Sequence, residues 1–598
     1  MARYNYIHST IVKTDQGDAV IANVKDADTN VSKLVIQENP MVPFWITKPA
    51  YRNHEFKKEY AQESELDGYI APSNRLGEEI YRALNDGRPP RGFIRFKQLL
   101  DSPYVYGADI EPEVLLKCKI KAANPDVPPP ILNIGALDIE TSVLGGNEII
   151  CATFVDGTTH EVYCSIYKPF MSNNKIKDIE GKIIKLNGTL EDLKERVRIR
   201  HKDFFEGLND AAKKLVDAKP FHVNYHITDD ELDEIQWLFD RINGCKPDFV
   251  CIWNMGYDIP YIIDRIRFRQ GNPADVMSHP DVPPKWRYCN FRPDRSEVDH
   301  ITDRWDWLDL TSYTCFVDSM CLYGRIRKVK GREISYRLEY IATKDLGTGK
   351  LDFGQGADHH VMQEEQFLDY VAYNIIDAVL LVLLDEMNED ISNLVSLSGY
   401  SRLQDFSRQT VQLKNYFYAK LREQHCVTAA VGNSMLTKWD TYIANVGGGV
   451  LSPTLAKNTG IAILEEASTI TDVCKYAADI DVTSFYPSAA DGSNISKETK
   501  LFTTLAIEGF DPGKEVRQKI YEEYGSDFKT NKSLPTKLKD QLDAQLYEAT
   551  KATSIHTEDY FGNVVAPYEN GVYVCHKFFN LPNYTEMLEL FNREHGVK

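Results

Sequence analysis

Runs of apolar residues bounded by polar turns divide the chain into stretches typical of strands and helices. Apolar runs separated by polar or glycine turns predict consecutive strands over residues 131–139, 148–155 and 161–167, and a further strand over 248–253. Apolar residues at helical spacing predict a long amphipathic helix from about Glu365 to Met387. Strands that alternate with helices in this way indicate a mixed α/β chain.

Proline, glycine and charged segments indicate where the domains of the chain meet. Prolines at 125 and 128–130 close a first segment of short strands and helices. More helix extends to about residue 443, and the glycine triplet 447–449 then follows as a linker. Beyond it the pattern predicts a strand ending at Asp481, a charged helical stretch over 512–550, a strand over 571–579 and a short helix over 585–593.

Length and composition are those of ordinary globular domains. The chain has 598 residues, of which 43% are hydrophobic and 26% charged. No apolar run approaches the ~20 residues that a bilayer requires, and the first ten residues lack the pattern of a signal peptide, so we expect neither. The eleven cysteines form no C-x-x-C pair, which favours free thiols in a reducing compartment over disulfides or a zinc finger.

The overall charge argues against a nucleic-acid-binding protein whose whole surface is basic. Lys and Arg number 69 against 88 Asp and Glu, a formal net charge of −19. A local basic groove remains compatible with this balance. Basic residues do gather in one stretch, which is either a solvated hairpin or loop, or a DNA contact: Arg325, Arg327, Lys328, Lys330, Arg332 and Arg337.

Two carboxylates at the end of the first predicted strand have a spacing that suits a metal ion. Asp138 and Glu140 are two residues apart, so on a strand both side chains point to the same face. Two carboxylates there can share a divalent cation, because hard cations take oxygen ligands. Taken alone, this D-x-E pattern is more often surface charge.

Two further acids have competing explanations. Asp258 follows a predicted strand and precedes Pro260, so a role as helix N-cap explains it completely. Asp377 lies four residues after Tyr373, on the same face of an apolar helix. A carboxylate in such surroundings is rare unless it is paired or binds a metal.

The four acids together predict phosphodiester hydrolysis. Asp138, Glu140, Asp258 and Asp377 can hold two cations about 4 Å apart. One cation would prepare a water molecule as nucleophile, and both would stabilise the charge that develops at phosphorus. Tyr373 can align that water.

A later acid has different surroundings. Asp481 ends an apolar strand and is followed by a turn that contains Ser484, Phe485 and Tyr486. Asp481 can bind a cation that also grips a triphosphate, and the backbone amides that follow it can meet phosphate oxygens. Tyr486 can form the floor beneath a sugar. A strand and turn of this kind also has a purely structural explanation.

These segments, in this order, resemble motifs of the family B DNA polymerases of large tailed bacteriophages of the T-even type. D-I-E at 138–140 is similar to the first exonuclease motif, N-M-G-Y-D at 254–258 to the second and Y-N-I-I-D at 373–377 to the third. The stretch 481–488 resembles polymerase motif A. Supporting similarities are K-W-D at 438–440, the glycine triplet and N-I-S-K-E-T at 494–499.

The resemblance implies roles for these residues. Asp138, Glu140, Asp258 and Asp377 would be the metal ligands of a 3′→5′ proofreading exonuclease with two Mg²⁺ or Mn²⁺ ions, and Tyr373 would orient the attacking water. Lys350 resembles a family lysine near that site. Asp481 would hold the Mg²⁺ of a bound deoxynucleoside triphosphate, with Ser484, Phe485 and Tyr486 lining the nucleotide pocket and Tyr486 excluding a ribose 2′-hydroxyl.

The resemblance also implies an organisation into domains and a cellular setting. We expect an N-terminal domain over 1–130, a ribonuclease-H-like exonuclease domain over 131–390, a helical return and linker over 391–450, and a partial palm over 451–598 that ends at the start of the fingers. The DNA partners would be a primer–template and a single-stranded 3′ end. The protein would act in the cytoplasm of an infected bacterial host, away from membranes.

Departures from the family pattern point to a second polypeptide. Phe485 replaces the usual leucine, and Val446 stands near the position of the linker tyrosine. The sequence contains neither the fingers motif K-x-x-x-N-S-x-Y-G nor the second palm motif D-T-D. Two-metal phosphoryl transfer needs carboxylates on both sides of the metals and a cationic clamp on the leaving phosphates. We therefore expect a partner chain with the fingers, the rest of the palm and the thumb, which would also provide any contact with a sliding clamp.

Two other functions compete with this split polymerase subunit. One is an exonuclease that acts alone, with the partial palm as a vestige or a DNA-docking surface. The other is a non-catalytic DNA-binding scaffold in a replication complex, which the intact acidic set disfavours.

Overall fold

The computed structural model describes most of residues 3–432 and several shorter segments further along the chain. The gaps in the first part are residues 16, 53–57, 59, 91, 93, 178–182, 186–187, 297–299, 329–330 and 352–358; the later described segments are 502–505, 514–526, 528–531, 533–550, 564–568 and 571–575. The chain divides into two compact units. The first comprises Met1–Phe44, Gly68–Ile94 and Gly107–Val427, and the second comprises Trp45–Asp67, Arg95–Tyr106 and Thr428–Lys598.

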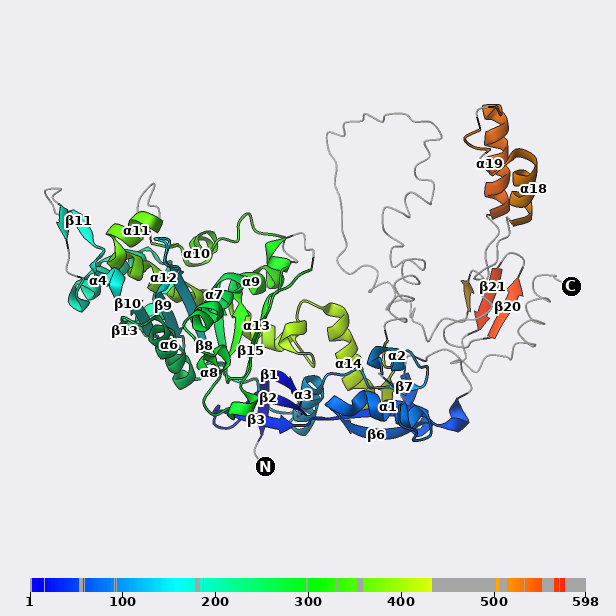
Figure 1. The fold of residues 1–598 in the computed structure, drawn as a ribbon, viewed down its shortest axis with the longest axis horizontal. Coiled ribbons are helices and arrows are strands. Elements are labelled where there is room, and N and C mark those ends of the chain that lie inside the picture. Colours follow the sequence, from blue (N-terminus) through cyan, green and yellow to red (C-terminus); the bar gives the residue numbers. More distant parts are fainter. Residues whose placement is uncertain are drawn as a thin grey trace. The chain divides into compact units, whose positions relative to one another are not determined.

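A six-stranded mixed sheet is the centre of the first unit (Figure 1). Its order is β13-β10-β9-β8-β14-β17. The first three strands in sequence form antiparallel neighbours, while β13, β14 and β17 each run parallel to the strand beside them. The strands are β8 (Ile134–Thr141), β9 (Ile149–Asp156), β10 (Glu161–Tyr167), β13 (His222–Thr228), β14 (Phe249–Ile252) and β17 (Cys315–Asp318).

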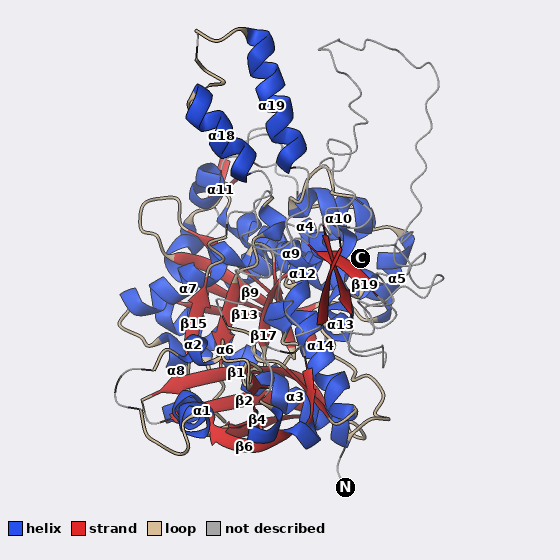
Figure 2. Ribbon diagram, turned by 90° about the vertical axis from the view of Figure 1, so that its right-hand side faces the viewer, coloured by secondary structure: helices blue, strands red, loops and turns tan. Residues whose placement is uncertain are grey.

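Helices cover both faces of this sheet, as the red strands and blue helices of Figure 2 show. Helix α12 (Phe367–Asn388) and α4 (Leu190–Gly207) pack on one face, where Ala136 and Val155 belong to their apolar core. Helices α6 (Glu231–Cys245) and α7 (Met255–Phe268) pack on the other face, against Leu137 and Ile139. Successive residues of β8 therefore alternate between the two cores, as a pleated strand requires.

The remaining elements of the first unit lie around this core. An antiparallel sheet of β1 (Tyr4–Thr14), β2 (Gly17–Asp26) and β3 (Ser32–Glu38) is joined to the six-stranded sheet by a fully buried ion pair between Lys25 and Asp248 at 2.6 Å. The further helices are α1 (Leu76–Leu84), α3 (Pro112–Ala123), α5 (Asp210–Ala218), α8 (Pro273–Met277), α9 (Ser319–Arg327), α10 (Leu338–Leu346), α11 (His359–Glu365), α13 (Asp390–Leu397) and α14 (Gln409–Glu423). Short strands pair as β11 (Lys175–Lys177) with β12 (Ile183–Lys185) and β15 (Cys289–Arg292) with β16 (Trp307–Leu310).

The second unit contains a helical pair and a small sheet. Helices α18 (Lys514–Tyr524) and α19 (Thr536–Thr550) share an apolar core of Ile520, Phe528 and Leu542. Strands β19 (Phe502–Leu505), β21 (Gly571–Cys575) and β20 (Val564–Tyr568) form an antiparallel sheet in that order. The short elements α2 (Phe96–Leu99), β5 (Tyr60–Gln62) and β7 (Val105–Tyr106) also belong to this unit. Three boundaries between the units fall within the strands β4 (Met41–Thr47), β6 (Leu66–Pro72) and β18 (Cys426–Thr428).

The mixed α/β class is confirmed, and most of the predicted elements are present. Strands β8, β9, β10 and β14 lie within a few residues of the predicted spans, and α12 begins two residues after the expected start. The predicted strand before Asp481 and the helix over 585–593 lie outside the described residues. The long apolar α12 has the length and composition of a membrane span, but almost all of it is buried inside the first unit, as in a core helix.

A candidate metal centre on the central sheet

Strand β8 presents Asp138 and Glu140 on the face that α12 covers. Their neighbours Leu137 and Ile139 belong to the opposite core, so the two carboxylates share one side of the sheet with Ala136. Strand β8 lies between β9 and β14 in the interior of the sheet. Strand β9 pairs with β8 at both carboxylate positions, and β14 pairs with it over Ile134–Ala136, so the backbone that carries the carboxylates is held in the sheet.

A polar stripe on α12 faces these two strand residues. Tyr370, Asn374 and Asp377 are spaced i, i+4 and i+7, so they lie along one side of the helix. The Tyr370 hydroxyl donates to Glu140 Oε2 at 2.5 Å, and the Asn374 amide donates to Asp138 Oδ2 at 2.7 Å. One turn of a helix rises about as far as two residues of a strand. Tyr370 and Asn374, one turn apart on α12, therefore meet Glu140 and Asp138, two residues apart on β8.

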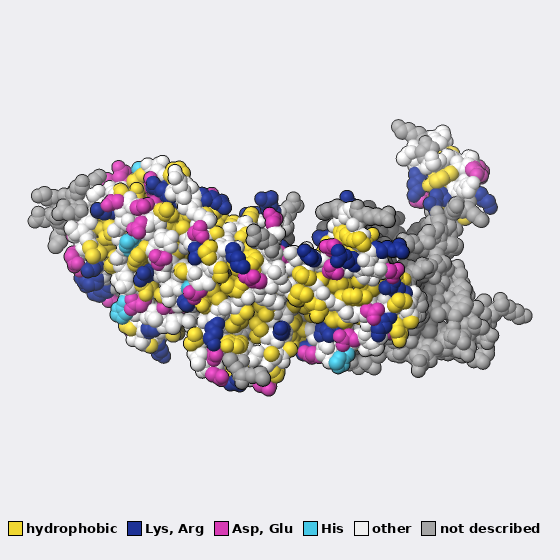
Figure 3. Space-filling model, turned by 60° about the horizontal axis from the view of Figure 1, so that its bottom comes forward, with side chains coloured by type: hydrophobic (Ala, Val, Ile, Leu, Met, Phe, Trp, Pro, Cys, Tyr) yellow, Lys and Arg dark blue, Asp and Glu magenta, His cyan; other side chains and the backbone are white. Residues whose placement is uncertain are grey.

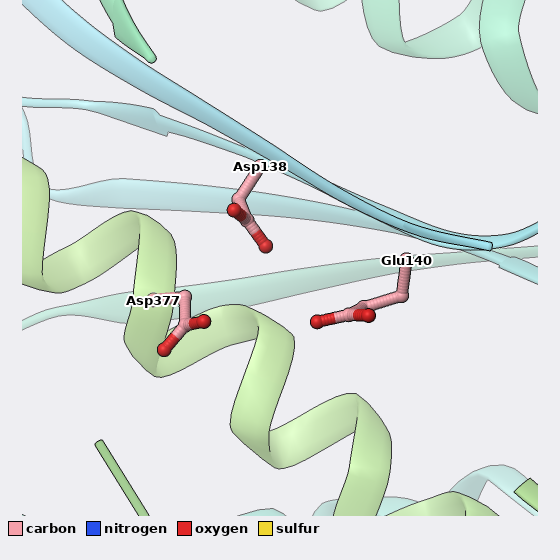
Figure 4. Close-up of side chains that lie close together, drawn as sticks. All are labelled: Asp138, Glu140 and Asp377. Carbon is pink, nitrogen blue, oxygen red and sulfur yellow. The ribbon is translucent and has the colours of Figure 1, made fainter. Parts of the chain in front are cut away.

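Three carboxylates converge between β8 and α12. Asp138, Glu140 and Asp377 each offer an oxygen such that the three atoms lie within 4.8 Å of one another, and Figure 4 shows the side chains pointing toward a common space. Burial and the charges of Asp377, Glu140 and Asp258 raise the pKa of Asp138 well above its usual range. Burial also raises the pKa of Glu140, to about 7. The carboxylates oppose one another's ionisation, so a cation would be attracted to the space between them.

Lys350 and Tyr373 complete this side of the cluster. The Lys350 ammonium forms an ion pair with Asp377 and donates to the Tyr373 hydroxyl at 2.8 Å. Burial lowers the pKa of Lys350, but the charges of Asp377, Tyr373 and Asp138 outweigh it and raise the pKa overall, so the lysine is protonated at neutral pH. The ring of Tyr373 stacks on Tyr370 at 5.9 Å between centroids.

Asp258 faces the cluster from α7 but is not one of the three converging carboxylates. It is buried, and burial together with the charges of Glu140 and Asp318 raises its pKa. The N-cap interpretation of Asp258 is wrong, because α7 begins at Met255 and Pro260 lies inside the helix.

The start of α7 is held by a residue from a neighbouring strand. Asp318, the last residue of β17, accepts a hydrogen bond from the Met255 N–H at 2.9 Å and another from the Cys321 N–H at 2.9 Å. One buried carboxylate therefore satisfies amides at the N-termini of both α7 and α9. Because it fixes the start of α7, Asp318 also fixes the helix that carries Asp258.

The residues present fit a divalent cation. All the converging groups are carboxylates, the ligands that Mg²⁺ and Mn²⁺ prefer. The Oδ1 atom of Asp377 is buried and has no hydrogen-bond partner among the described residues. A buried carboxylate oxygen without a partner is costly, and a bound cation would satisfy it.

A cavity of about 750 Å³ opens beside the carboxylates. Asp138, Lys350 and Tyr373 contribute to its lining. The rest of the lining includes apolar residues and Glu339 as well as aromatic and basic groups, namely Trp253, His300, Tyr336 and Arg337. The cavity therefore joins the acidic cluster to surfaces on which a flat ring can stack and to a cationic group.

In its described residues, the basic stretch at 325–337 is a helix end and a loop, one of the predicted alternatives. Arg325 and Arg327 belong to the last turn of α9, and a loop follows. Arg327 pairs with Asp390 at 2.9 Å, while Lys328 and Arg332 pair with Asp303 at 2.8 and 2.9 Å. Most of these cations therefore fasten α9 and its loop to the unit, whereas Arg337 reaches the cavity and Lys330 lies outside the described residues. On the face drawn in Figure 3, basic and acidic side chains are likewise interspersed.

The predicted polymerase residues lie outside the described part of the chain. These are Asp481, Ser484, Phe485 and Tyr486, together with the motifs at 438–440, 447–449 and 494–499. Their roles stay predictions.

Sequence reasoning missed several residues that shape the cluster. Asn374 is fully buried in an apolar helix one turn before Asp377, a signal that it must have a polar partner. Tyr370 carries the same signal one turn earlier. Gln363 donates to the Thr141 carbonyl and accepts from the Val143 N–H, both at 2.8 Å, which ties α11 to the end of β8.

Comparison with known proteins gives one informative similarity. No protein-family model matches the chain. The DNA-directed DNA polymerase of Enterobacteria phage T4 is 23% identical over 300 residues, which are 49% of this chain and 29% of that polymerase. The aligned stretch therefore spans less than a third of the length of that relative. The similarity supports a distant relationship between this chain and a phage DNA polymerase.

Proposed function

We propose that the first unit is a metal-dependent 3′→5′ exonuclease that removes nucleotides from the 3′ end of single-stranded DNA, as the proofreading part of a DNA-directed DNA polymerase. The observation that carries this proposal is the convergence of Asp138, Glu140 and Asp377 within 4.8 Å, with Asp258 facing them. The similarity to a phage DNA polymerase supports the same function.

The carboxylates would hold Mg²⁺ or Mn²⁺. When bound, such cations lower the pKa of a water molecule and stabilise the charge that develops at phosphorus. Asp138, Glu140 and Asp377 would supply the shared ligand oxygens, and Asp258 would contribute a further carboxylate from α7. The buried Oδ1 of Asp377 would gain a ligand in this way.

Tyr373 and Lys350 would act on the attacking water and on local charge. The Tyr373 hydroxyl is fixed by the Lys350 ammonium and by stacking on Tyr370, so it can accept or donate a hydrogen bond in a defined direction. The positive charge of Lys350 offsets part of the repulsion among the carboxylates. Both groups are preorganised, which limits the reorganisation needed during reaction.

The cavity beside the cluster suits an unpaired DNA end. Aromatic rings stack on bases of any sequence, and a positive groove follows the phosphates. Trp253, His300 and Tyr336 offer rings, while Arg337 offers a cation at the same opening. These groups support a single-stranded substrate with little sequence preference.

The similarity to a polymerase favours a second activity, nucleotide incorporation, for which these residues supply only part of the site. Asp481 would hold the metal of an incoming nucleotide, with Ser484, Phe485 and Tyr486 around the sugar and phosphates. The second carboxylate motif and the fingers motif are missing from the printed sequence. We propose that further polypeptide supplies these two motifs, so that nucleotide incorporation requires it in addition to these 598 residues.

The exonuclease proposal is tested with a single-stranded oligonucleotide labelled at its 5′ end. With Mg²⁺ or Mn²⁺, the purified chain should shorten it stepwise from the 3′ end, and EDTA should stop the reaction. The Asp138→Ala plus Glu140→Ala variant should lose the activity, while Asp203→Ala plus Glu206→Ala, an exposed acidic pair on α4, should keep it. A nuclease rate that survives the first double substitution would refute the site.

The split polymerase is tested by primer extension. The chain alone should incorporate no nucleotide, and incorporation should begin when a polypeptide carrying the fingers and second palm motifs is added. Extension by the purified chain alone would contradict this proposal without affecting the exonuclease.

A further inference from the structure

A short chain of hydrogen bonds links the strand beside β8 to the Asp138 carboxylate. The Thr153 hydroxyl on β9 donates to Asn374 Oδ1 at 2.6 Å, and Asn374 Nδ2 donates to Asp138 Oδ2 at 2.7 Å. Thr153 and Asn374 are both fully buried. Thr153 is also the direct cross-strand partner of Asp138, so both side chains stand on the α12 face of the sheet.

Each group in this chain fixes the next. The Thr153 hydroxyl donates to the Asn374 amide oxygen and so holds the amide in place, while the Asp138 carboxylate, which can only accept, requires the NH₂ group on its own side. A hydrogen bond to one carboxylate oxygen limits rotation of the Asp138 side chain. Without it, repulsion from Glu140 and Asp377 would favour turning the carboxylate away from the cluster.

The neutrality of these donors matters as much as their position. Asp377 is held by a lysine, whose charge competes with any cation that approaches. Asp138 is held by an amide, and Glu140 by the Tyr370 hydroxyl, so neither donor brings a positive charge that competes with a metal ion for its carboxylate. Neutral groups that orient metal ligands in this way commonly contribute 10- to 100-fold to affinity, roughly.

We propose that Asn374 and Thr153 are positioning residues that hold Asp138 in its metal-binding orientation, with Thr153 acting through Asn374. This inference rests on the proposed exonuclease site. Neither residue is a metal ligand, and neither needs to touch the substrate.

The test measures Mn²⁺ affinity of the full chain by the electron paramagnetic resonance signal of the free ion, at pH 7.5. Thr153→Val preserves volume and removes only the hydroxyl, so Mn²⁺ affinity should fall about 10-fold or more. Thr153→Ser keeps the hydroxyl and should bind like the parent chain. A Thr153→Val variant with unchanged affinity would overturn the inference.

A double substitution tests the order of action. Asn374→Leu should weaken Mn²⁺ binding at least as much as Thr153→Val, and the two together should be no worse than Asn374→Leu alone. The double variant also replaces both hydrogen-bonding partners by apolar groups, which protects the fold if Thr153→Val alone is unstable. Additive losses would contradict a role of Thr153 through Asn374.

Asp138→Ala separates this inference from the proposed function. If Asp138→Ala binds Mn²⁺ as tightly as the parent chain, the metal site itself is wrong. If Asp138→Ala abolishes binding while Thr153→Val and Asn374→Leu do not weaken it, the metal site stands and only the positioning role fails.

Discussion

Buried Glu231 and the half-buried pair Asp138 and Glu140 lie on opposite faces of the same sheet and have different partners. On the side of α6 and α7, Glu231 accepts from Arg265 at 2.7 and 2.6 Å and from Arg269 at 2.8 Å. On the α12 side, Asp138 and Glu140 face other carboxylates, with Lys350 as the nearby cation.

The pKa values reflect this difference. Burial raises the pKa of Glu231, but hydrogen bonds from Arg265, the Ile149 N–H and Arg269 outweigh it and lower the pKa overall. In the cluster of Asp138, Glu140, Asp258 and Asp377, burial raises the pKa of each acid. Like charges add to this rise at Asp138, Glu140 and Asp258, whereas at Asp377 the positive charge of Lys350 opposes it. Removing a buried acid that has its own cations leaves those cations uncompensated, whereas acids that face one another attract a cation from outside.

The largest expected effect is on catalysis. Asp377→Asn should reduce the exonuclease rate by about 10³-fold or more, because groups that act as a unit in a reaction are not replaced by their neighbours. Glu231→Gln should leave the rate per folded molecule unchanged. The measurement is single-turnover cleavage of a labelled single strand of DNA at saturating Mg²⁺. Equal rate losses in the two variants would contradict the claim that Asp377 is catalytic and Glu231 is structural.

Stability of the metal-free chain should respond in the reverse order. Glu231→Gln leaves Arg265 and Arg269 without their buried counter-charge and should cost about 3 kcal/mol. Asp138→Asn removes one of several repelling charges and keeps an acceptor for Asn374, so it should cost nothing or stabilise. Denaturant unfolding in EDTA measures both, and a larger loss for Asp138→Asn would show that the comparison is reversed.

The pH dependence should also distinguish the metal-free and metal-bound states. The folded pKa of Glu140, about 7, lies above its ordinary value of 4.5. The folded chain therefore favours the protonated form of Glu140. The stability that Glu140 contributes to the metal-free fold is fully present below about pH 4.5 and is lost as the pH rises through 7. Metal binding must displace this proton, so Mn²⁺ affinity should instead rise with pH through 7, by up to about tenfold per unit for one proton. Calorimetric titrations at pH 6 and 8 measure the affinity, and an affinity that falls with pH would contradict the assignment.

The smallest expected effect concerns Tyr370. The hydrogen bond from Tyr370 lowers the pKa of Glu140. Tyr370→Phe removes this bond, so it should raise the pKa of Glu140 and weaken Mn²⁺ binding near pH 7. We expect a loss at the lower end of about 10- to 100-fold, because the ring still stacks on Tyr373. Unchanged Mn²⁺ affinity in Tyr370→Phe would show that Glu140 is oriented by other contacts.

The order of apolar and polar residues along the chain predicted those strands and helices whose burial follows from their own sequence. The runs at 131–139 and 148–155 were recognisable because buried strands read as apolar stretches between turns, and α12 because its apolar residues recur at helical spacing. Helices α4 and α5 were not predicted. The apolar face of α4 is narrow, with Leu193, Val197 and Phe204 among many charged residues.

The candidate site depends on contacts that no local pattern contains. Asp138 and Asp377 come from distant parts of the chain. Their convergence was predicted from the four acids taken together and from the resemblance of their segments to exonuclease motifs. The N-cap interpretation of Asp258 failed because the group that holds the start of α7 is Asp318, on another strand. Thr153 could not be recognised at all, since a threonine in a buried strand is ordinary until its partner is known.

Anomalous diffraction from crystals of the full chain grown with Mn²⁺ tests the metal centre most directly. The account predicts a peak between β8 and α12, within ligand distance, roughly 2.0–2.2 Å, of oxygens from Asp138, Glu140 and Asp377. A chain that shows no peak at these three carboxylates, with Lys350 still paired to Asp377 at saturating Mn²⁺, would contradict it.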